Sequence, residues 1–276
     1  MNYLKMGAVI MSLFLASNCS FAQTLSTTNN VNTLKLERNP YGFIFTTIEI
    51  NGQSVKALID FGDPSQLQLS GSFAEQQQIP LEATGEMMMH IDGSTFSVNK
   101  GVVNTLSIGE WQYEKIEFRS SPGEIEFVAE QIGTSFNAVL GWGYFSRYYT
   151  LMNYAQNIFE LSIDKPAVDE VLYEQAYLKK SNYLSLAIDL GEAQGNFILD
   201  TGSTDSFIDS TYVQDLKLEN LNLTVGAAEL PLQLQVQDLS VLKPIHAVGI
   251  IGADFLSNYE ILLDPFEKNL LFASKK

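Results

Sequence analysis

The sequence contains very little cysteine or histidine. Its 276 residues include one cysteine, Cys19, and two histidines, His90 and His246. Cys19 lies in a segment that we expect to be removed on export, so the mature chain would have neither a disulfide bond nor a thiol nucleophile. The histidines lie 156 positions apart with no cysteine or histidine at ligand spacing, which argues against a metal site. Ser206 and Ser210 have no histidine at motif spacing, which argues against a serine hydrolase.

Basic residues are also scarce. The chain has 16 lysines and arginines against 32 aspartates and glutamates, a formal net charge of −16. A surface of this charge repels nucleic acids and anionic membrane surfaces, so we expect neither as a partner. We interpret the negative charge as a means of keeping an exported protein soluble, in preference to the steering of a basic substrate.

The N-terminal apolar run, Ala8–Ala16, is too short to span a bilayer, and we expect no stable membrane span. Lys5 precedes this run, and Ser20-Phe21-Ala22 places small residues at the two positions that a signal peptidase reads. We therefore predict that residues 1–22 are a signal peptide cleaved before Gln23, and that the protein is exported to the periplasm or secreted.

An alternative gives Cys19 a role as the lipid-bearing N-terminus of an anchored protein. Asn18 stands directly before Cys19, where lipidation favours a small residue, and the leucine that such a signal needs lies one place too far away. Export without an anchor is the preferred prediction.

Two short acidic motifs, 140 positions apart, are the most informative feature of the chain. Asp200-Thr201-Gly202-Ser203 follows the apolar run Phe197–Leu199, and Asp60-Phe61-Gly62-Asp63 follows Leu58-Ile59. The same offset aligns further positions without a gap, pairing Phe43 with Tyr183, Ile48 with Ile188, Glu49 with Asp189 and Ile50 with Leu190. This pattern indicates a duplicated unit.

A second offset, of 111 positions, repeats an apolar segment that ends in glycine. It pairs Ala138–Gly141 with Gly249–Gly252, Phe145–Tyr148 with Leu256–Tyr259, and Leu151–Asn153 with Leu262–Asp264. Each half therefore carries an acidic turn followed by an apolar segment in the same order. Asp254 and Asp264 lie in the closing region of the second half, where we expect them to accept hydrogen bonds from backbone amides.

The secondary structure predicted from the sequence is mainly β, in short runs that glycine, asparagine and proline interrupt. Phe43–Ile50, the turn Asn51-Gly52 and Val55–Ile59 have the form of a hairpin that ends at Asp60. Residues 181–199 repeat this form before Asp200. Short helices are expected after the two acidic turns, at Ser72–Gln78 and Thr211–Leu216.

The predicted domain organisation has four parts. Residues 1–22 are the signal peptide, and residues 23–39 are a polar segment within which we expect Thr24–Asn32 to be a mobile tether. Residues 40–165 form a first lobe and residues 170–276 a second, and a break that contains Pro166 separates them.

The different lengths of the two halves predict a flap, a hairpin that covers the cleft, on the first lobe alone. The distance from the acidic turn to the repeated glycine is 81 positions in the first half and 52 in the second, and 23 of the extra 29 fall in one segment. The pattern of this segment predicts a hairpin, with strands Glu86–Ile91 and Phe96–Val98 on either side of the turn Asp92–Thr95. Asp92, Gly93 and Ser94 at its tip, and His90 beside it, are candidate substrate contacts; the alternative is an ordinary surface hairpin.

The Asp-Thr-Gly-Ser motif after two apolar residues, with Gly249–Leu256 and Ile261–Pro265 later in the chain, resembles the unit of retropepsin-like aspartic proteases. The tandem arrangement, with Gly141–Tyr149 in the first half, is similar to pepsin and extends over residues 40 to 272. The resemblance implies two pseudo-symmetric, β-barrel-like lobes with Asp60 and Asp200 facing each other across a cleft. It implies a monomeric endopeptidase that acts on peptides or proteins without a cofactor or metal.

The chemistry of this family explains the residue types. Two carboxyl groups held close together share one proton; the ionised one activates a water molecule and the protonated one polarises the peptide carbonyl. Gly62 and Gly202 leave room for the carboxylates. The resemblance implies that Thr201 forms a hydrogen bond to the opposite lobe and that Ser203 donates to the outer oxygen of Asp200.

The first half departs from this pattern at two positions. Phe61 stands where the family has threonine or serine, so its half of the buried hydrogen-bonded contact is missing. Asp63 stands in place of a small hydroxyl donor, and it either repels Asp60 or takes up a proton itself. Two alternatives to an active monomer follow: an inactive relative that binds peptides, and a homodimer that pairs Asp200 of two chains.

Overall fold

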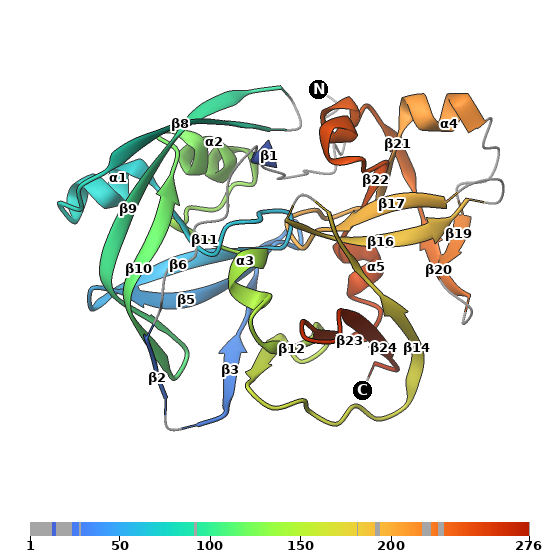
Figure 1. Ribbon diagram of the computed structural model, residues 1–276, viewed down its shortest axis with the longest axis horizontal. Coiled ribbons are helices and arrows are strands. Elements are labelled where there is room, and N and C mark those ends of the chain that lie inside the picture. The colour runs from blue at the N-terminus through green and yellow to red at the C-terminus, as the bar shows by residue number, and fades with distance from the viewer. Residues whose placement is uncertain are drawn as a thin grey trace.

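The computed structural model describes residues 13–14, 24–27, 29–90, 93–180, 182–190, 194–216, 222–225 and 229–275. The fold is mainly β, as the sequence predicts. Figure 1 shows two lobes side by side, the first in blue to green and the second in yellow to red, with a further sheet below them. In the described part of the chain, no helix has the length and apolar character needed to cross a membrane.

The first lobe is built on a sheet to which ten of the described strands belong, in the order β1-β8-β9-β10-β7-β11-β6-β5-β4, with β2 paired to β10. Three short helices, α1 (Gly71–Gln76), α2 (Glu124–Gln131) and α3 (Trp142–Phe145), complete it. The strands are β1 (Leu13–Phe14), β2 (Thr24–Ser26), β4 (Glu37–Arg38), β5 (Ile44–Ile50), β6 (Gln53–Asp60), β7 (Gln68–Leu69), β8 (Glu82–Met89), β9 (Thr95–Ile108), β10 (Trp111–Ser120) and β11 (Ala138–Gly141).

The second lobe is built on a sheet of six described strands in the order β15-β16-β17-β22-β18-β21, with a separate pair of strands, β19 and β20. Its helices are α4 (Ser210–Leu216), α5 (Ala253–Leu256) and the 3-10 helix η1 (Ser240–Ile245). The strands are β15 (Leu178–Lys180), β16 (Tyr183–Asp189), β17 (Gln194–Leu199), β18 (Phe207–Asp209), β19 (Asn222–Val225), β20 (Leu230–Gln233), β21 (Gln235–Gln237) and β22 (Gly249–Ile251).

A third sheet joins the two halves of the chain. Its described strands run in the order β14-β24-β23-β12-β13-β3, with β12 and β23 antiparallel at the junction. Asn153 at the end of β12 donates a hydrogen bond from Nδ2 to Glu260 Oε1 of β23, 2.8 Å away. The strands are β3 (Val31–Lys35), β12 (Tyr149–Asn153), β13 (Ile158–Ser162), β14 (Val171–Ala176), β23 (Glu260–Asp264) and β24 (Asn269–Ala273).

The duplication indicated by the sequence is visible in the strand pairing. The strand before each acidic turn pairs in parallel with the repeated apolar strand, β6 with β11 in the first lobe and β17 with β22 in the second. The predicted helices after the turns are α1 and α4, within about two residues of their expected bounds. Each half also contributes a hairpin, β12–β13 or β23–β24, to the shared sheet.

The described residues of the N-terminal segment form paired strands, contrary to the predicted tether. β2 pairs with β10, β3 with β13 and β4 with β5. Along β3 the residues alternate between exposed and buried, and Leu34 is buried in the core. Asn32 is also buried; its Nδ2 donates to the Ile108 carbonyl at 2.7 Å and its Oδ1 accepts from Glu110 N at 2.9 Å. The polar composition concealed this alternation, because only every second residue faces inward.

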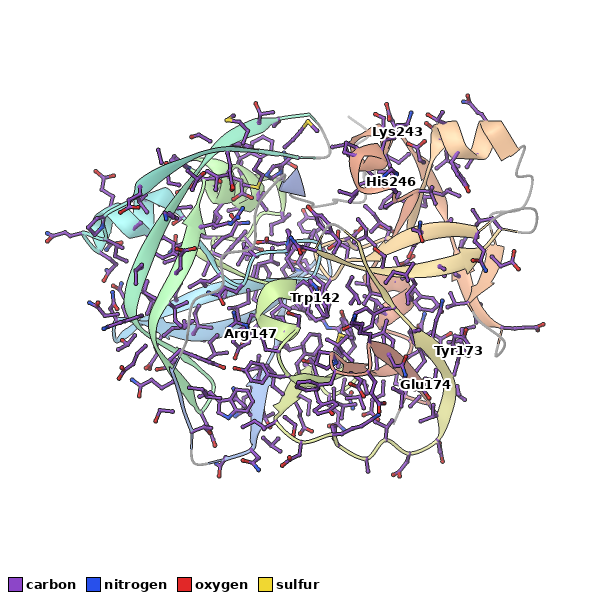
Figure 2. The ribbon with its side chains drawn as sticks, viewed as in Figure 1. Trp142, Arg147, Tyr173, Glu174, Lys243 and His246 are labelled. Atoms are coloured by element: carbon purple, nitrogen blue, oxygen red, sulfur yellow. The ribbon has the colours of Figure 1, made fainter. Side chains whose placement is uncertain are left out.

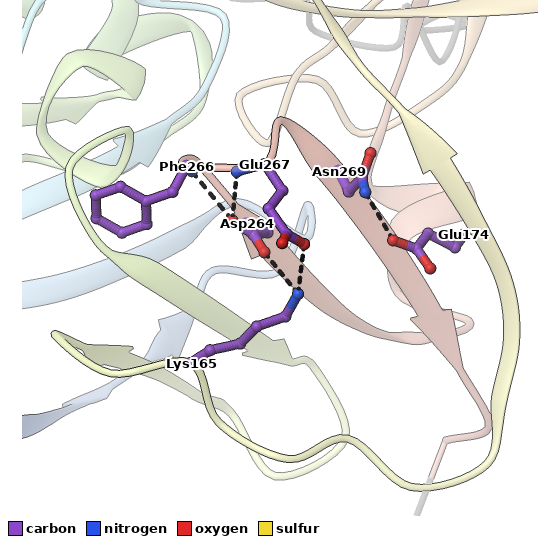
Figure 3. Close-up of polar contacts among 6 residues, drawn as sticks. All are labelled: Lys165, Glu174, Asp264, Phe266, Glu267 and Asn269. Carbon is purple, nitrogen blue, oxygen red and sulfur yellow. Dashed lines mark hydrogen bonds and ion pairs between the residues drawn. The ribbon is translucent and has the colours of Figure 1, made fainter.

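The segment between β13 and β14, which contains Pro166, is anchored to the shared sheet by one lysine. Lys165 Nζ lies 2.8 Å from both Asp264 Oδ2 and Glu267 Oε2 (Figure 3). Oδ1 of the buried Asp264 accepts the backbone N–H groups of Phe266 and Glu267, which confirms its predicted role as an acceptor for backbone donors. Burial raises the pKa of Asp264, but these bonds and Lys165 outweigh it and hold the pKa below its usual value.

Candidate functional site

Each motif aspartate lies at the end of a buried strand. β6 ends at Asp60, and Asp200 follows directly after β17. The apolar residues before each aspartate are fully buried, so these strands carry the two carboxyl groups into the interior, where Asp60 is 1% exposed and Asp200 0% exposed. Their neighbours in the parallel pairing are equivalent, because Ile59 pairs with Leu140 and Leu199 pairs with Ile251.

The two turns meet between the lobes, with each glycine against the opposite carboxyl group. A Cβ atom added to Gly62 would lie 2.7 Å from Asp200 Cγ, and one added to Gly202 would lie 2.6 Å from Asp60 Cγ. Both distances are shorter than any van der Waals contact allows, so both positions require glycine. Each glycine N–H also donates to the aspartate of its own turn, at 2.8 Å to Asp60 Oδ1 and 2.7 Å to Asp200 Oδ1.

The two carboxyl groups lie close together where the turns meet, and their surroundings raise the pKa of both. Burial raises the pKa of Asp60 well above its usual value, and the charges of Asp200 and Asp63 raise it further. Burial also raises the pKa of Asp200, against the opposing effect of hydrogen bonds from its neighbours. Two such groups in a water-poor site retain one proton between them over a pH range in which isolated aspartates are ionised.

Thr201 links the two turns through a buried hydroxyl. Its Oγ1 accepts the Phe61 N–H at 3.0 Å and donates to the Ile59 carbonyl at 2.9 Å. The side chain comes from the second lobe and both partners come from the first. This contact is the one that the family resemblance implies for Thr201, and it fixes the Asp60 turn relative to the Asp200 turn.

We expect Thr201→Val to destabilise the protein by about 2 to 4 kcal/mol, because it removes the hydroxyl partner of two buried backbone groups while keeping the side-chain shape. Urea unfolding followed by circular dichroism measures this change. Thr201→Ser keeps the hydroxyl and serves as the matched control, with an expected loss below about 1 kcal/mol. Equal stability of the valine and serine variants would contradict the assigned role of Oγ1.

Phe61 replaces the missing hydroxyl with aromatic packing. Its ring is fully buried, with centroid distances of 4.9 Å to Phe145, 5.8 Å to Trp142 and 6.4 Å to Phe159. Trp142 lies at the centre of the molecule (Figure 2), and its ring meets that of Tyr177 at 5.9 Å. At this position the first lobe therefore contributes aromatic packing, whereas the second lobe contributes the Thr201 hydroxyl that joins the two turns.

Ser203 does not have the expected partner. Its Oγ donates to the Asp205 carbonyl at 2.7 Å, a bond that closes its own turn, and the hydroxyl proton is therefore directed away from Asp200. Asp254 acts as predicted, since its carboxylate accepts from the backbone N–H groups of Ser206 and Phe255 at 3.1 and 2.8 Å.

Asp63 is buried but points into its own loop. Ser65 donates to it from N at 2.8 Å and from Oγ at 2.9 Å, and Gln68 Nε2 donates at 2.6 Å. Burial raises the pKa of Asp63, and these three hydrogen bonds oppose the shift because they favour the ionised form. No sequence pattern marked Gln68 as a partner of Asp63, because the two become neighbours only when β7 enters the sheet beside β10 and β11.

The predicted hairpin is formed by β8 and β9, which extend along the top of the first lobe in Figure 1. At its tip His90 N donates to Ser94 O at 2.8 Å, and Gly93 N, at a φ of 86°, donates to His90 O at 2.9 Å. Asp92 lies outside the described residues. Within the described part of the second lobe, β19 and β20 form a simple hairpin and no strand corresponds to β8.

His90 is a buried anchor of this hairpin, which contradicts its expected contact with substrate. It is 3% exposed, and its Nε2 lies 3.2 Å from Glu124 Oε1 at the start of α2. The rings of Phe96 and Phe127 flank it at 5.2 and 5.9 Å. Burial raises the pKa of Glu124, and the hydrogen bond and charge of His90 oppose that shift. No sequence pattern marked Glu124 as a partner, because it lies 34 positions from His90.

We expect Glu124→Gln to loosen the hairpin, because it weakens the polar contact that fastens the tip to α2. Hydrogen exchange measured by mass spectrometry should become about tenfold faster in β8, which corresponds to roughly 1.4 kcal/mol of local stability. Glu126→Gln changes an exposed glutamate of the same helix and is the control. Unchanged exchange in β8 of the Glu124 variant would show that the His90 contact does not hold the hairpin.

No group of three or more histidine, cysteine, aspartate or glutamate side chains in the described part of the chain is arranged to hold a metal ion. The other histidine, His246, follows η1 in the second lobe (Figure 2), where its carbonyl accepts from Asn196 Nδ2 at 3.2 Å.

One comparison with known proteins found a similarity within the first lobe. Residues 46–142 match the family model described as aspartyl protease. The matched segment begins in β5, contains Asp60 and its turn, and ends at Trp142. A search of curated proteins found no match to the chain. The family match therefore rests on the half that has Phe61 and Asp63 at the two unusual positions.

Proposed function

We propose that the protein is an endopeptidase in which Asp60 and Asp200 together activate a water molecule. The match of residues 46–142 to the aspartyl protease family model supports this proposal. The observation that carries the proposal is the reciprocal contact of the two turns, in which each glycine touches the carboxyl group of the other motif. A shared proton on two buried carboxyl groups is the requirement for general acid and base chemistry on one water molecule.

The proposed reaction divides the work between the two carboxyl groups. The ionised one takes a proton from water as the water attacks the peptide carbonyl, and the protonated one donates a hydrogen bond to the carbonyl oxygen. The N–H groups of Gly62 and Gly202 hold one oxygen of each aspartate in place. Thr201 holds the turns together. No covalent intermediate with the protein forms.

We further propose that an extended peptide lies along β8. In the described chain β8 pairs on one side with β9 and on the other with β1, and β1 falls inside the predicted signal peptide. Removal of residues 1–22 would leave this edge of β8 unpaired, and an unpaired strand edge binds an extended peptide by backbone hydrogen bonds. Gly93 and Ser94 at the tip of the hairpin are the proposed contacts with the peptide, together with Asp92.

Two further proposals concern the state of the protein. Since both aspartates come from one chain and the two halves share a sheet, we propose an active monomer in preference to a dimer that pairs Asp200 of two chains. We also propose that the mature protein begins at Gln23 and acts outside the cytoplasm. Sizing in solution tests the first of these: activity that disappears on dilution of a dimer would contradict it.

The enzyme proposal is tested by incubating purified residues 23–276 with an unstructured polypeptide from pH 3 to pH 8 and identifying the products by mass spectrometry. We expect internal cleavage, with one atom of label from 18O water in each new carboxyl group and no acyl-enzyme. The variant Asp200→Asn is the control. Equal digestion by the variant and the wild type would contradict the proposal.

The alternative is a protein that binds peptides without cleaving them. Phe61 and Asp63 favour this alternative, because the first-lobe turn differs from the second in its side-chain contacts. The same experiment separates the two functions when binding is measured alongside cleavage. Saturable binding of the polypeptide with no product at any pH would support the inactive binder.

A further inference from the structure

Asp63 and Ser203 occupy equivalent places in the two turns, so the second lobe provides an internal reference for the first. The backbone contacts are the same: Trp142 N donates to Asp63 O at 2.7 Å, and Ala253 N donates to Ser203 O at 2.8 Å. The backbone N–H groups of Asp63 and Ser203 donate to the carbonyls of Asp60 and Asp200, respectively. The turns therefore differ at this place in the side chain and not in the backbone.

The first lobe is built to hold a carboxylate at this place. Asp63 accepts three hydrogen bonds, two from Ser65 and one from Gln68. Gln68 lies opposite Val139 and Arg119 in its sheet, and the equivalent position in the second lobe is the buried Phe207. The position that supplies an amide donor to Asp63 in the first lobe is therefore a phenylalanine in the second lobe.

The charged groups around Asp63 come from five elements. Asp60 at the end of β6 and Asp200 after β17 lie close enough for the charge of Asp63 to raise the pKa of both, and Glu124 in α2 is affected in the same direction. Arg119 in β10 favours the ionised form of Asp63, and its NH1 lies 3.2 Å from Glu86 Oε2 in β8. The charge of Asp63 therefore raises the pKa of both members of the Asp60–Asp200 pair. The nearby cation, Arg119, also contacts Glu86 in β8.

We propose that Asp63 is a positioning residue whose buried negative charge keeps the single proton on the Asp60–Asp200 pair at higher pH than an isolated pair would keep it. The inference rests on the proposed function, since its consequence is a working range nearer to neutral pH. A negative charge beside the pair makes its proton harder to lose, and it also makes a second proton easier to gain. Both limbs of the pH profile therefore move upward.

The test compares the pH dependence of kcat/KM in the wild type, Asp63→Ser and Asp63→Asn. Asp63→Ser introduces the side chain of the second lobe, and Asp63→Asn keeps the shape without the charge. Both variants should move both limbs to lower pH by about one pH unit. Gln68→Leu, which removes one donor that favours the ionised carboxylate, should move them in the same direction by less. Asp238→Asn, at an exposed site, should leave the profile in place. Profiles that do not move in active Asp63 variants would overturn the inference.

A second readout does not depend on catalysis, and it separates this inference from the proposed function. With 13C-labelled aspartate, NMR follows the side-chain carboxyl carbons of Asp60 and Asp200 during a pH titration of wild type and Asp63→Asn. Lower midpoints for the pair in the variant support the inference even if no peptide is cleaved. Unchanged midpoints overturn it even if the wild type is an active peptidase.

Discussion

Asp200→Asn is expected to reduce peptide cleavage by about 10³-fold or more and to make the protein harder to unfold at neutral pH. The loss of activity follows from the loss of proton transfer, because an amide cannot share a proton with Asp60 or take one from water. Asparagine has nearly the same shape as aspartate and leaves the reciprocal glycine contacts in place. The loss of activity therefore does not require a change of fold. Asp60→Asn should have the same effect.

The gain in stability has a defined dependence on pH. Burial raises the pKa of both aspartates above their value in the unfolded chain, which is about 3.9. The folded wild type therefore binds more protons than the unfolded chain above this pH, and its stability falls as the pH rises through that window. Asparagine does not titrate. We therefore expect little difference at pH 3.5 and a melting temperature about 5 °C higher for the variant at pH 7.

Both effects are measured on the same preparations, cleavage by product formation and stability by calorimetry at several pH values. Asp238→Asn is the control because it makes the same chemical change at an exposed position in the second lobe. A melting-temperature difference that is largest in acid would contradict the assignment of a protonated buried pair. Full activity of Asp200→Asn would contradict its catalytic role.

Phe61→Thr is expected to destabilise the protein by about 3 to 5 kcal/mol, although it restores the residue type that aspartic proteases have at this position. The Phe61 ring fills a fully buried site against Phe145, Trp142 and Phe159, and threonine would leave a cavity there. The new hydroxyl would also enter an apolar site, where a polar group without a partner is unfavourable.

Chemical unfolding in urea measures this loss, and Phe61→Leu is the matched control. Leucine keeps an apolar side chain of intermediate size, so we expect a smaller loss, of about 1 to 2 kcal/mol. A Phe61→Thr variant as stable as the wild type would show that the aromatic cluster does not hold the first-lobe turn. Its activity then tests whether a second hydroxyl contact between the lobes improves the site.

The positions of Asp60 and Asp200 illustrate how much of the site is visible in the sequence. Two constant offsets, 140 and 111, revealed the repeated strands and turns, and the longer first half revealed the hairpin that β8 and β9 form. These features can be predicted from the sequence because strand and turn formation depend on neighbouring residues along the chain. The resemblance to aspartic proteases then implied that the two aspartates face each other.

The sequence did not predict the contact partners of the side chains around these turns. Ser203 and Asp63 follow the motif aspartates at the same place, yet the structure directs both toward their own loops. His90 looked like an exposed residue of a hairpin tip, and the fold buries it against Glu124. The polar N-terminal segment was expected to be mobile, but its described strands β2 and β3 pair with β10 and β13. Each outcome depends on a strand or helix that is distant in sequence.

The sequence alone determined that this chain is a duplicated, mainly β protein with one acidic turn in each half, because repeated local patterns specify repeated local structure. Only the tertiary structure decided which groups surround those turns. Packing of Phe61, the hydrogen bonds to Asp63 and the hydroxyl contact of Thr201 all join segments that meet after the sheets have formed. Those contacts set the proton affinity and stability of the site, and no local pattern encodes them.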